Sequence, residues 1–423
     1  MEPGRGQSFV CRDPVHGLIR FAGADAGLAS ILDTAAMQRL RRIRQMGFAS
    51  LVYPGAEHTR FGHALGAAHV AGRVTAALGL PDDIARDVKV GALLHDVGHG
   101  PFSHAWEVAL AGPSHEAWGA RILAEDEELR AALARIAPEL PERVSALFAK
   151  KYRPSYAVKL VSSQLDVDRM DYLLRDAHAA GVGYSAYDLD WVIHALRVEK
   201  VRGGDDPEDL VLDWSRGLHA VEQFLAGRFY MYAQVYYHKT VRAAETMFLF
   251  VMRRFAELAR TGREPAGLPT AGRMARGESV SVASYLALDD AKVSVALDAW
   301  THDPDAVLAE LARGLTRRRL WKTIDLGSDP EIVDTIEARL AERARAELGA
   351  EVAPWAWAID RGERLGYKVA PGQELVVVGH PGGPAELATF MSGRALSAQA
   401  FSVRVLCAPA LVDGFKQTIA GAR

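Results

Sequence analysis

Residues 91–101 read Gly-Ala-Leu-Leu-His-Asp-Val-Gly-His-Gly-Pro. The residues that lead into this stretch place Ile84, Val88 and His95 on one face of a helix. The glycines and the proline at its end disfavour continuation, so His95 and Asp96 leave the helix together. A neutral imidazole and a carboxylate are both common ligands of divalent metals. His95 could equally be a core histidine with one satisfied hydrogen bond, because it shares the apolar face.

Other candidate ligands accompany this pair. Seven of the 14 histidines fall between residues 58 and 115, and His63 stands at a predicted helix start. Asp166, Asp168 and Asp171 share about one turn of an otherwise apolar helix, where they need a counter-charge, a metal or solvent. Two histidines and two aspartates form a mixed nitrogen and oxygen site, which suits manganese, iron, zinc or magnesium.

The pattern of apolar residues predicts a mainly α fold. Helices are predicted over 29–46, 63–78, 81–97, 155–180, 217–260, 282–300, 304–314 and 331–347, and residues 261–279 read as a loop. Alternating residues predict a small β-hairpin over 196–212, and strands at 355–359, 374–378 and 401–407 predict a C-terminal α+β lobe. We therefore expect a helical core over 1–260, a helical extension over 261–350 and the lobe over 351–423.

Composition excludes several classes of protein. The 423 residues are 49% hydrophobic with a net charge of −3, which argues against disorder and against a protein whose main partner is nucleic acid. The longest apolar stretch, 247–252, is too short for a membrane span. The first residues hold no apolar signal segment, and two cysteines make no disulfide framework, so we expect a cytoplasmic protein. P-loop, zincin and paired-cysteine motifs are missing from the sequence.

Taken together, six stretches resemble the HD-domain superfamily of metal-dependent phosphohydrolases, and within it the deoxynucleoside triphosphate triphosphohydrolases. They occur in family order and cover roughly residues 9–250. The stretches are Asp13–Gly17, Gln38–Arg41, Phe61–Gly66, His95–His104, Asp166–Tyr172 and Tyr236–Lys239. The resemblance implies an HD-domain helical core.

The resemblance also implies roles for individual residues. It implies four ligands of a divalent metal: His63, His95, Asp96 and Asp168. It implies four catalytic side chains: His99 and His104 facing the α-phosphate, His115 as a further active-site histidine, and Glu107 supporting His115, where the family usually has aspartate. It places three arginines on the phosphates: Arg60, Arg169 and Arg228. It implies contacts to the nucleoside from Gln45, Tyr172 and Asp176 at the sugar and Tyr236 at the base. Plainer readings make Tyr172 a core residue, pair Asp176 with Arg175, and leave Arg60 as a surface charge.

The activity that the resemblance implies is hydrolysis of a deoxynucleoside triphosphate to the deoxynucleoside and inorganic triphosphate. One alternative is a phosphodiesterase or nucleotidase acting on other nucleotides or on single-stranded nucleic acid. Another is a nucleotide-sensing module without catalysis. The family likeness further implies a homodimer or homotetramer built partly from the C-terminal lobe. A nucleotide effector is possible near Asp33, Gln38 and Arg41, although Phe9 and Arg12 depart from the vertebrate pattern.

Overall fold

Three helices form the centre of the N-terminal half of the chain, namely α3 (Arg60–Ala77), α4 (Asp82–Leu94) and α10 (Val167–Ala180). The computed structural model describes residues 8–110, 112–200, 206–327, 331–364, 374–390 and 400–421. Helix α3 is rich in alanine and glycine, and small side chains allow neighbouring helices to approach closely. Helix α4 begins after Pro81 with two aspartates in its first turn, where they complement the positive end of the helix dipole.

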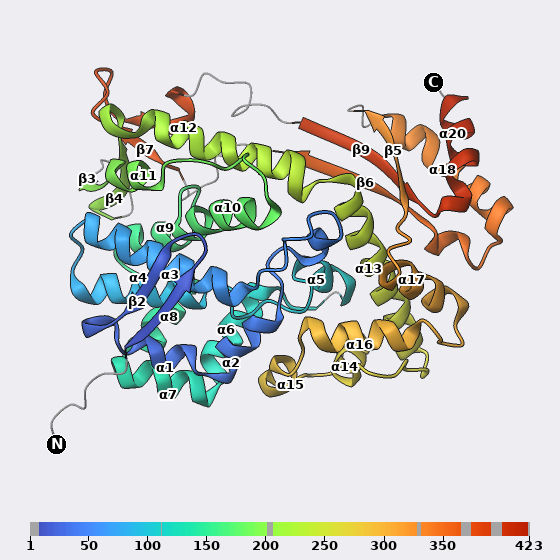
Figure 1. The fold of residues 1–423 in the computed structure, drawn as a ribbon, viewed down its shortest axis with the longest axis horizontal. Helices are drawn as coiled ribbons and strands as arrows, with labels where there is room; N and C mark the ends of the chain where they lie inside the picture. The colour runs from blue at the N-terminus through green and yellow to red at the C-terminus, as the bar shows by residue number, and fades with distance from the viewer. Residues whose placement is uncertain are drawn as a thin grey trace.

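Further helices surround this centre and extend from it (Figure 1). On the N-terminal side they are α1 (Leu28–Leu32), α2 (Ala35–Arg39), α5 (His104–Leu110), α6 (His115–Glu125), α7 (Glu127–Ile136), α8 (Leu140–Phe148), α9 (Ser155–Val161) and α11 (Leu189–Ala195). Then follow α12 (Trp214–Met231), α13 (Lys239–Arg260), α14 (Pro269–Ala275), α15 (Val282–Leu286), α16 (Asp290–Trp300), α17 (Ala306–Thr316), α18 (Glu331–Leu348) and α20 (Val412–Ala420). Helix α13 buries one face in the same core as α3 and α4, so it ties the extension to the centre.

Three small sheets complete the fold. Strands β1 (Phe9–Asp13) and β2 (Gly17–Phe21) pair as an N-terminal hairpin. The predicted hairpin is present as β3 (Leu196–Lys200) and β4 (Glu208–Asp213), and β7 (Val376–Val378) joins it in parallel, followed by β8 (Ala385–Glu386). The C-terminal sheet has the order β5-β9-β6, from Lys322–Gly327, Ala400–Cys407 and Trp357–Arg364. A mainly α fold with a small hairpin and a C-terminal α+β region is therefore confirmed.

Several boundaries differ from the sequence expectation. The helix predicted over 155–180 is two helices, because Asp166 leaves the helical conformation and caps α10 by accepting from the amide of Arg169 at 2.8 Å. Residues 261–279, predicted as a loop, contain α14, whose first residue is Pro269, a favourable helix start. The sequence reading missed β1, β2 and β5. Strand β5 lies in the predicted extension but pairs with β9 of the predicted lobe, and β7 of the lobe pairs with β4 of the predicted core. The division into three parts stays a prediction. Among the described residues, no helix is long and apolar enough to cross a bilayer.

Two glycines of α3 provide a matched test of the close approach between α3 and α10. A Cβ atom on Gly66 would overlap the carboxylate of Asp171, whereas one on Gly72 would meet only the flexible side chain of Lys89 at 3.5 Å. We expect Gly66→Ala to lower the free energy of unfolding by about 1–3 kcal/mol through overpacking. Gly72→Ala should be neutral or stabilising by up to about 1 kcal/mol, because alanine is the better helix former. Urea denaturation measures both, and equal effects would contradict the close approach.

Candidate metal centre and substrate cleft

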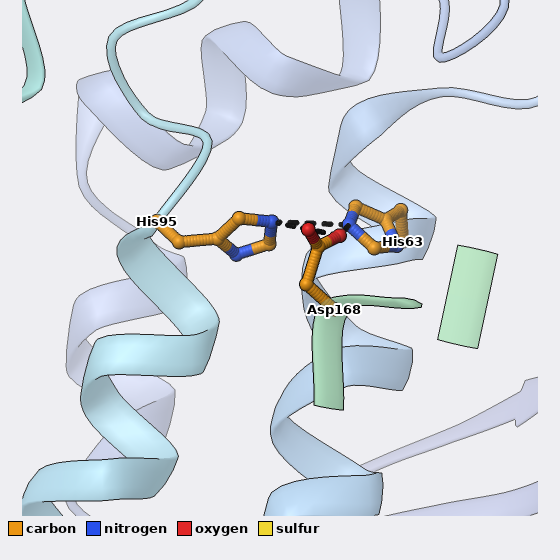
Figure 2. Close-up of side chains that lie close together, drawn as sticks. All are labelled: His63, His95 and Asp168. Atoms are coloured by element: carbon orange, nitrogen blue, oxygen red, sulfur yellow. Dashed lines mark hydrogen bonds and ion pairs between the residues drawn. The ribbon is translucent and has the colours of Figure 1, made fainter. Parts of the chain in front are cut away.

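Side chains from three helices converge at the centre of the molecule. His63 lies one turn into α3, His95 caps the C-terminus of α4, and Asp168 lies in the first turn of α10. The Nε2 atoms of the two histidines are 3.1 Å apart, and Asp168 Oδ1 lies 3.1 Å from Nε2 of His63 and 3.4 Å from that of His95 (Figure 2). Asp96 Oδ1 lies 3.3 Å from His95 Nε2, so all four predicted ligands meet here.

The spacing of these atoms suits a single divalent metal. Ligand atoms that lie about 2.1 Å from one ion, at right angles to each other, are about 3.0 Å apart. The distances among His63, His95 and Asp168 are close to that value, and these three residues form one group that could hold a metal. Two imidazole nitrogens and carboxylate oxygens make a donor set that suits zinc, manganese or iron, and magnesium less well.

Hydrogen bonds on the far side of each ring aim the Nε2 atoms inward. His63 Nδ1 lies 2.7 Å from the carboxylate of Asp171, and His95 Nδ1 lies 2.7 Å from the carbonyl of Ala92. Because both partners are acceptors, Nδ1 donates in each case, and Nε2 can present a lone pair to a metal. Asp171 is itself held by Arg175, at 2.8 and 2.9 Å.

Three carboxylates, those of Asp96, Asp168 and Asp171, meet at this site and favour positive charge beside them. Burial alone would raise the pKa of Asp168, yet the His95 and His63 rings hold that pKa far below its ordinary range. Burial disfavours the charged form of His63, but its hydrogen bonds to Asp168 and Asp171 raise its pKa to about 10. The site without metal thus retains a proton where a metal ion would bind.

Arg60 links the centre to the loop that follows α4. It is 5% exposed, donates to Asp96, and reaches the hydroxyl of Ser103 through Nε at 3.0 Å and Nη2 at 2.7 Å. Although burial would raise the pKa of Asp96, Arg60 and His95 hold it well below the usual value. The alternative of a surface charge is therefore wrong for Arg60.

A second group of titratable side chains lies beside the first. The rings of His99 and His115 stack at 3.9 Å, and His115 Nδ1 lies 2.9 Å from Glu107 Oε1. Burial, followed by the charge of Arg60, keeps the pKa of His99 well below its ordinary value. A Cβ atom on Gly98 would overlap the backbone of α6, so glycine there allows α6 to bring His115 close. The side chain of His104 lies outside the described part of the structure.

A cleft of about 750 Å³ opens over both groups, a size typical of small-molecule sites. Most of the predicted substrate residues line it: Gln45, Arg60, Arg169, Tyr172, Asp176 and Tyr236. Arg228 is not in the lining; it bonds Gln164 at 2.9 Å, and its guanidinium lies 5.8 Å from the centre of the Tyr232 ring, which does line the cleft. The buried Oε1 of Gln45 and Nε of Arg169 have no hydrogen-bond partner among the described residues.

Tyr172, Asp176 and Tyr236 are neighbours in the lining of the cleft. The hydroxyl of Tyr236 donates to Asp176 at 2.7 Å, and His58 Nε2 lies 2.7 Å from the other oxygen of that carboxylate. Burial and the nearby Asp176 raise the pKa of Tyr236 well above 10, so its hydroxyl remains a donor. Asp176 does not pair with Arg175, which bonds Asp13 and Asp171 instead.

The sequence analysis found most of the site residues but missed several residues that hydrogen-bond to them and orient them. His16, Asp171 and Arg175 form a buried network around His63; Asp171 carried a signal as one of three acidic residues on a turn, and His16 only as part of the Asp13–Gly17 stretch. Tyr232 and Tyr237 also line the cleft and could have been found from their position beside the Tyr236 motif. Ser103, which binds Arg60, had no signal beyond its motif.

The chain matches two family models and several relatives. Residues 60–176 match the HD domain, and residues 194–266 match the HD associated region. The uncharacterized protein YwfO of Bacillus subtilis is 34% identical over 328 residues, which is 76% of this chain and 73% of that protein. The human deoxynucleoside triphosphate triphosphohydrolase SAMHD1 is 30% identical over 277 residues, which is 56% of this chain and 43% of that enzyme.

Two solved structures are similar over nearly the whole chain. A phosphohydrolase from Bacteroides thetaiotaomicron is 29% identical with a TM-score of 0.80, and covers 95% of this chain and 99% of its own. A hypothetical protein from Aquifex aeolicus is 27% identical with a TM-score of 0.75, and covers 97% of this chain and 100% of its own. The side chains that could hold a metal lie within the region that matches the HD model, and the chain belongs to the HD-domain superfamily of phosphohydrolases.

Proposed function

We propose that this protein hydrolyses deoxynucleoside triphosphates to deoxynucleosides and inorganic triphosphate. The observation that carries the proposal is the composition of one cleft. Its lining includes His95, Asp96 and Asp168, the arginines Arg60 and Arg169, and Tyr172 and Asp176, which lie one helical turn apart. Similarity to SAMHD1, whose name states this activity, supports the choice of substrate, although this chain spans less than half of that enzyme.

The substrate phosphates would contact cationic side chains in the cleft. A triphosphate carries several negative charges, and guanidinium groups bind them best through paired N–H donors. Arg60 and Arg169 line the cleft and are held by Asp96 and Asp166, which fixes their direction. Arg228 would have to exchange its bond to Gln164 for a phosphate oxygen, because it is outside the lining as the structure stands.

The chemical step is attack of water on the α-phosphorus with cleavage of the bond to the 5′-oxygen. A divalent metal, when bound by His63, His95, Asp96 and Asp168, polarises a phosphoryl oxygen and lowers the pKa of water. The departing oxygen needs a proton. His104 or His115, when protonated, would supply it, and His115 would donate from Nε2 because its Nδ1–H bonds Glu107. His99 and His104 complete the proposed catalytic set around the α-phosphate.

Selection of the deoxyribose would come from Tyr172 and Asp176 in the lining of the cleft. A tyrosine ring packed against C2′ leaves no room for a 2′-hydroxyl, and an aspartate accepts from the 3′-hydroxyl. Tyr172 and Asp176 can do both, while Tyr236 and Gln45 also line the cleft and would contact the base and the sugar.

We expect the active form to be a homodimer or homotetramer. Light scattering on the purified protein measures this.

Product analysis tests the activity. Purified protein incubated with each dNTP and a divalent metal should release deoxynucleoside and triphosphate in equal amounts. Asp168→Ala should lower turnover at least about 1,000-fold, because it removes a ligand of the site, while Asp190→Ala, on the exposed surface, is the matched control. Release of pyrophosphate or monophosphate would support a nucleotidase or phosphodiesterase instead. Tight dNTP binding without turnover would support a sensing module.

Metal affinity should depend on pH in a defined direction. His63 has a pKa of about 10 without metal, so below pH 10 a metal must displace at least one proton. We therefore expect the apparent affinity for zinc or manganese to fall about tenfold for each pH unit between pH 8 and pH 6. Competition with a chelator measures this slope. A flat profile would contradict binding at His63.

Two substitutions at Tyr172 separate its ring from its hydroxyl. Tyr172→Ala should reduce the preference for dNTPs over rNTPs by about tenfold or more, because it opens space at C2′. Tyr172→Phe keeps the ring and should retain the preference. The ratio of kcat/KM for a dNTP and its ribose counterpart measures both, and an unchanged ratio in Tyr172→Ala would remove this residue from sugar selection.

A further inference from the structure

The loop that leads into α5 has a backbone that ordinary residues rarely adopt. Phe102 and Ser103 have φ angles of 51° and 56°, in the left-handed region that favours glycine. Such a conformation persists only where the surrounding contacts fix it. Ser103 lies within this loop and accepts both hydrogen bonds from the guanidinium of Arg60 that do not go to Asp96. The loop conformation therefore decides where Arg60 points.

One carboxylate from a distant segment holds this loop. Asp290, the first residue of α16, accepts from the amide of Phe102 through Oδ1 at 2.9 Å. It is 6% exposed, and it lies beyond both regions that match the family models, which end at residues 176 and 266. The hydroxyl of Tyr285 in the same segment donates to the carbonyl of Gly98 at 2.7 Å, so the segment contacts both ends of the loop.

The second oxygen of Asp290 acts on the other side of Arg60. Oδ2 accepts from the amide of Arg44 at 2.9 Å. The carbonyl of Ile43, the residue before Arg44, accepts a hydrogen bond from the amide of Arg60 at 2.9 Å. The two oxygens of Asp290 thus fix the segment that holds the Arg60 backbone and the loop that holds its guanidinium.

We propose that Asp290 is a positioning residue for Arg60 and, through it, for Asp96. By holding Phe102 and Ser103 in the left-handed conformation, the carboxylate keeps the Arg60 side chain directed at Asp96 and the phosphate-binding part of the cleft. The kinetic part of this inference rests on the proposed function, whereas the effect on the loop does not. The extension at 285–290 is then part of the active site rather than an accessory to it.

Asp289 is the matched control, because it is an equally buried neighbour with different partners. It caps α16 through the amide of Lys292 and binds Arg42, but not the Phe102 amide. The test compares Asp290→Ala, Asp290→Asn and Asp289→Ala by thermal denaturation, by hydrogen–deuterium exchange over residues 97–106, and by kcat and KM for a dNTP.

At a temperature where all variants are folded, Asp290→Ala should accelerate exchange in the loop. It should also lower kcat by about 10- to 100-fold, with a smaller change in KM. Asp290→Asn keeps one acceptor and should recover part of both effects. Asp289→Ala should lower the melting temperature yet leave loop exchange and kcat within about twofold of wild type. Equal loss of kcat in Asp289→Ala and Asp290→Ala, or unchanged loop exchange in Asp290→Ala, would overturn the proposal.

Failure of the proposed function would look different. If the wild-type protein hydrolyses no dNTP, loop exchange still distinguishes Asp290 from Asp289. Metal affinity is a second measurement that needs no turnover. In Asp290→Ala, Arg60 is no longer held against Asp96, which is one of the proposed metal ligands. Asp290→Ala should weaken metal binding and Asp289→Ala should not. Unchanged metal affinity together with unchanged loop exchange would refute the positioning role whatever the substrate is.

Discussion

Burial of negative charge at the junction of α3, α4 and α10 is the constraint on which the structure depends. Asp96 and Asp171 are almost fully buried, and Asp168 faces the same centre. Buried carboxylates are costly unless cations and hydrogen bonds compensate them. Arg60 compensates Asp96, and Arg175 compensates Asp171, each within 3 Å. The remaining charge is met by imidazoles, and this arrangement is what makes the centre attractive to a divalent metal.

Because the same residues neutralise charge and shape the cleft, fold and site cannot be separated. Gly66 lets Asp171 lie against α3, and Asp171 in turn sets the ring of His63. Gly98 lets α6 approach, and α6 carries His115 to its stack on His99. Small residues therefore control the site through how closely backbones approach, which is a packing effect rather than a chemical one.

Local patterns predicted the elements whose signals are local. The end of α4 followed from glycine and proline after His95, and the β3–β4 hairpin followed from alternation around a turn. The break before α10 was missed because a capping aspartate and a helical aspartate look alike until the backbone is known. Strands β1, β2 and β5 were missed because their stability comes from partners, and short strands carry little pattern of their own.

The sequence by itself determined which residues have the chemistry of a metal site, since imidazoles and carboxylates at family spacing are visible without coordinates. It also determined the mainly α class through helical periodicity. Only the tertiary structure decided the hydrogen bonds that orient those ligands, the bond of Arg228 to Gln164, and the reach of Asp290 to Phe102. These depend on contacts between segments up to 188 positions apart, and side-chain direction across such distances is set by packing, which no local pattern records.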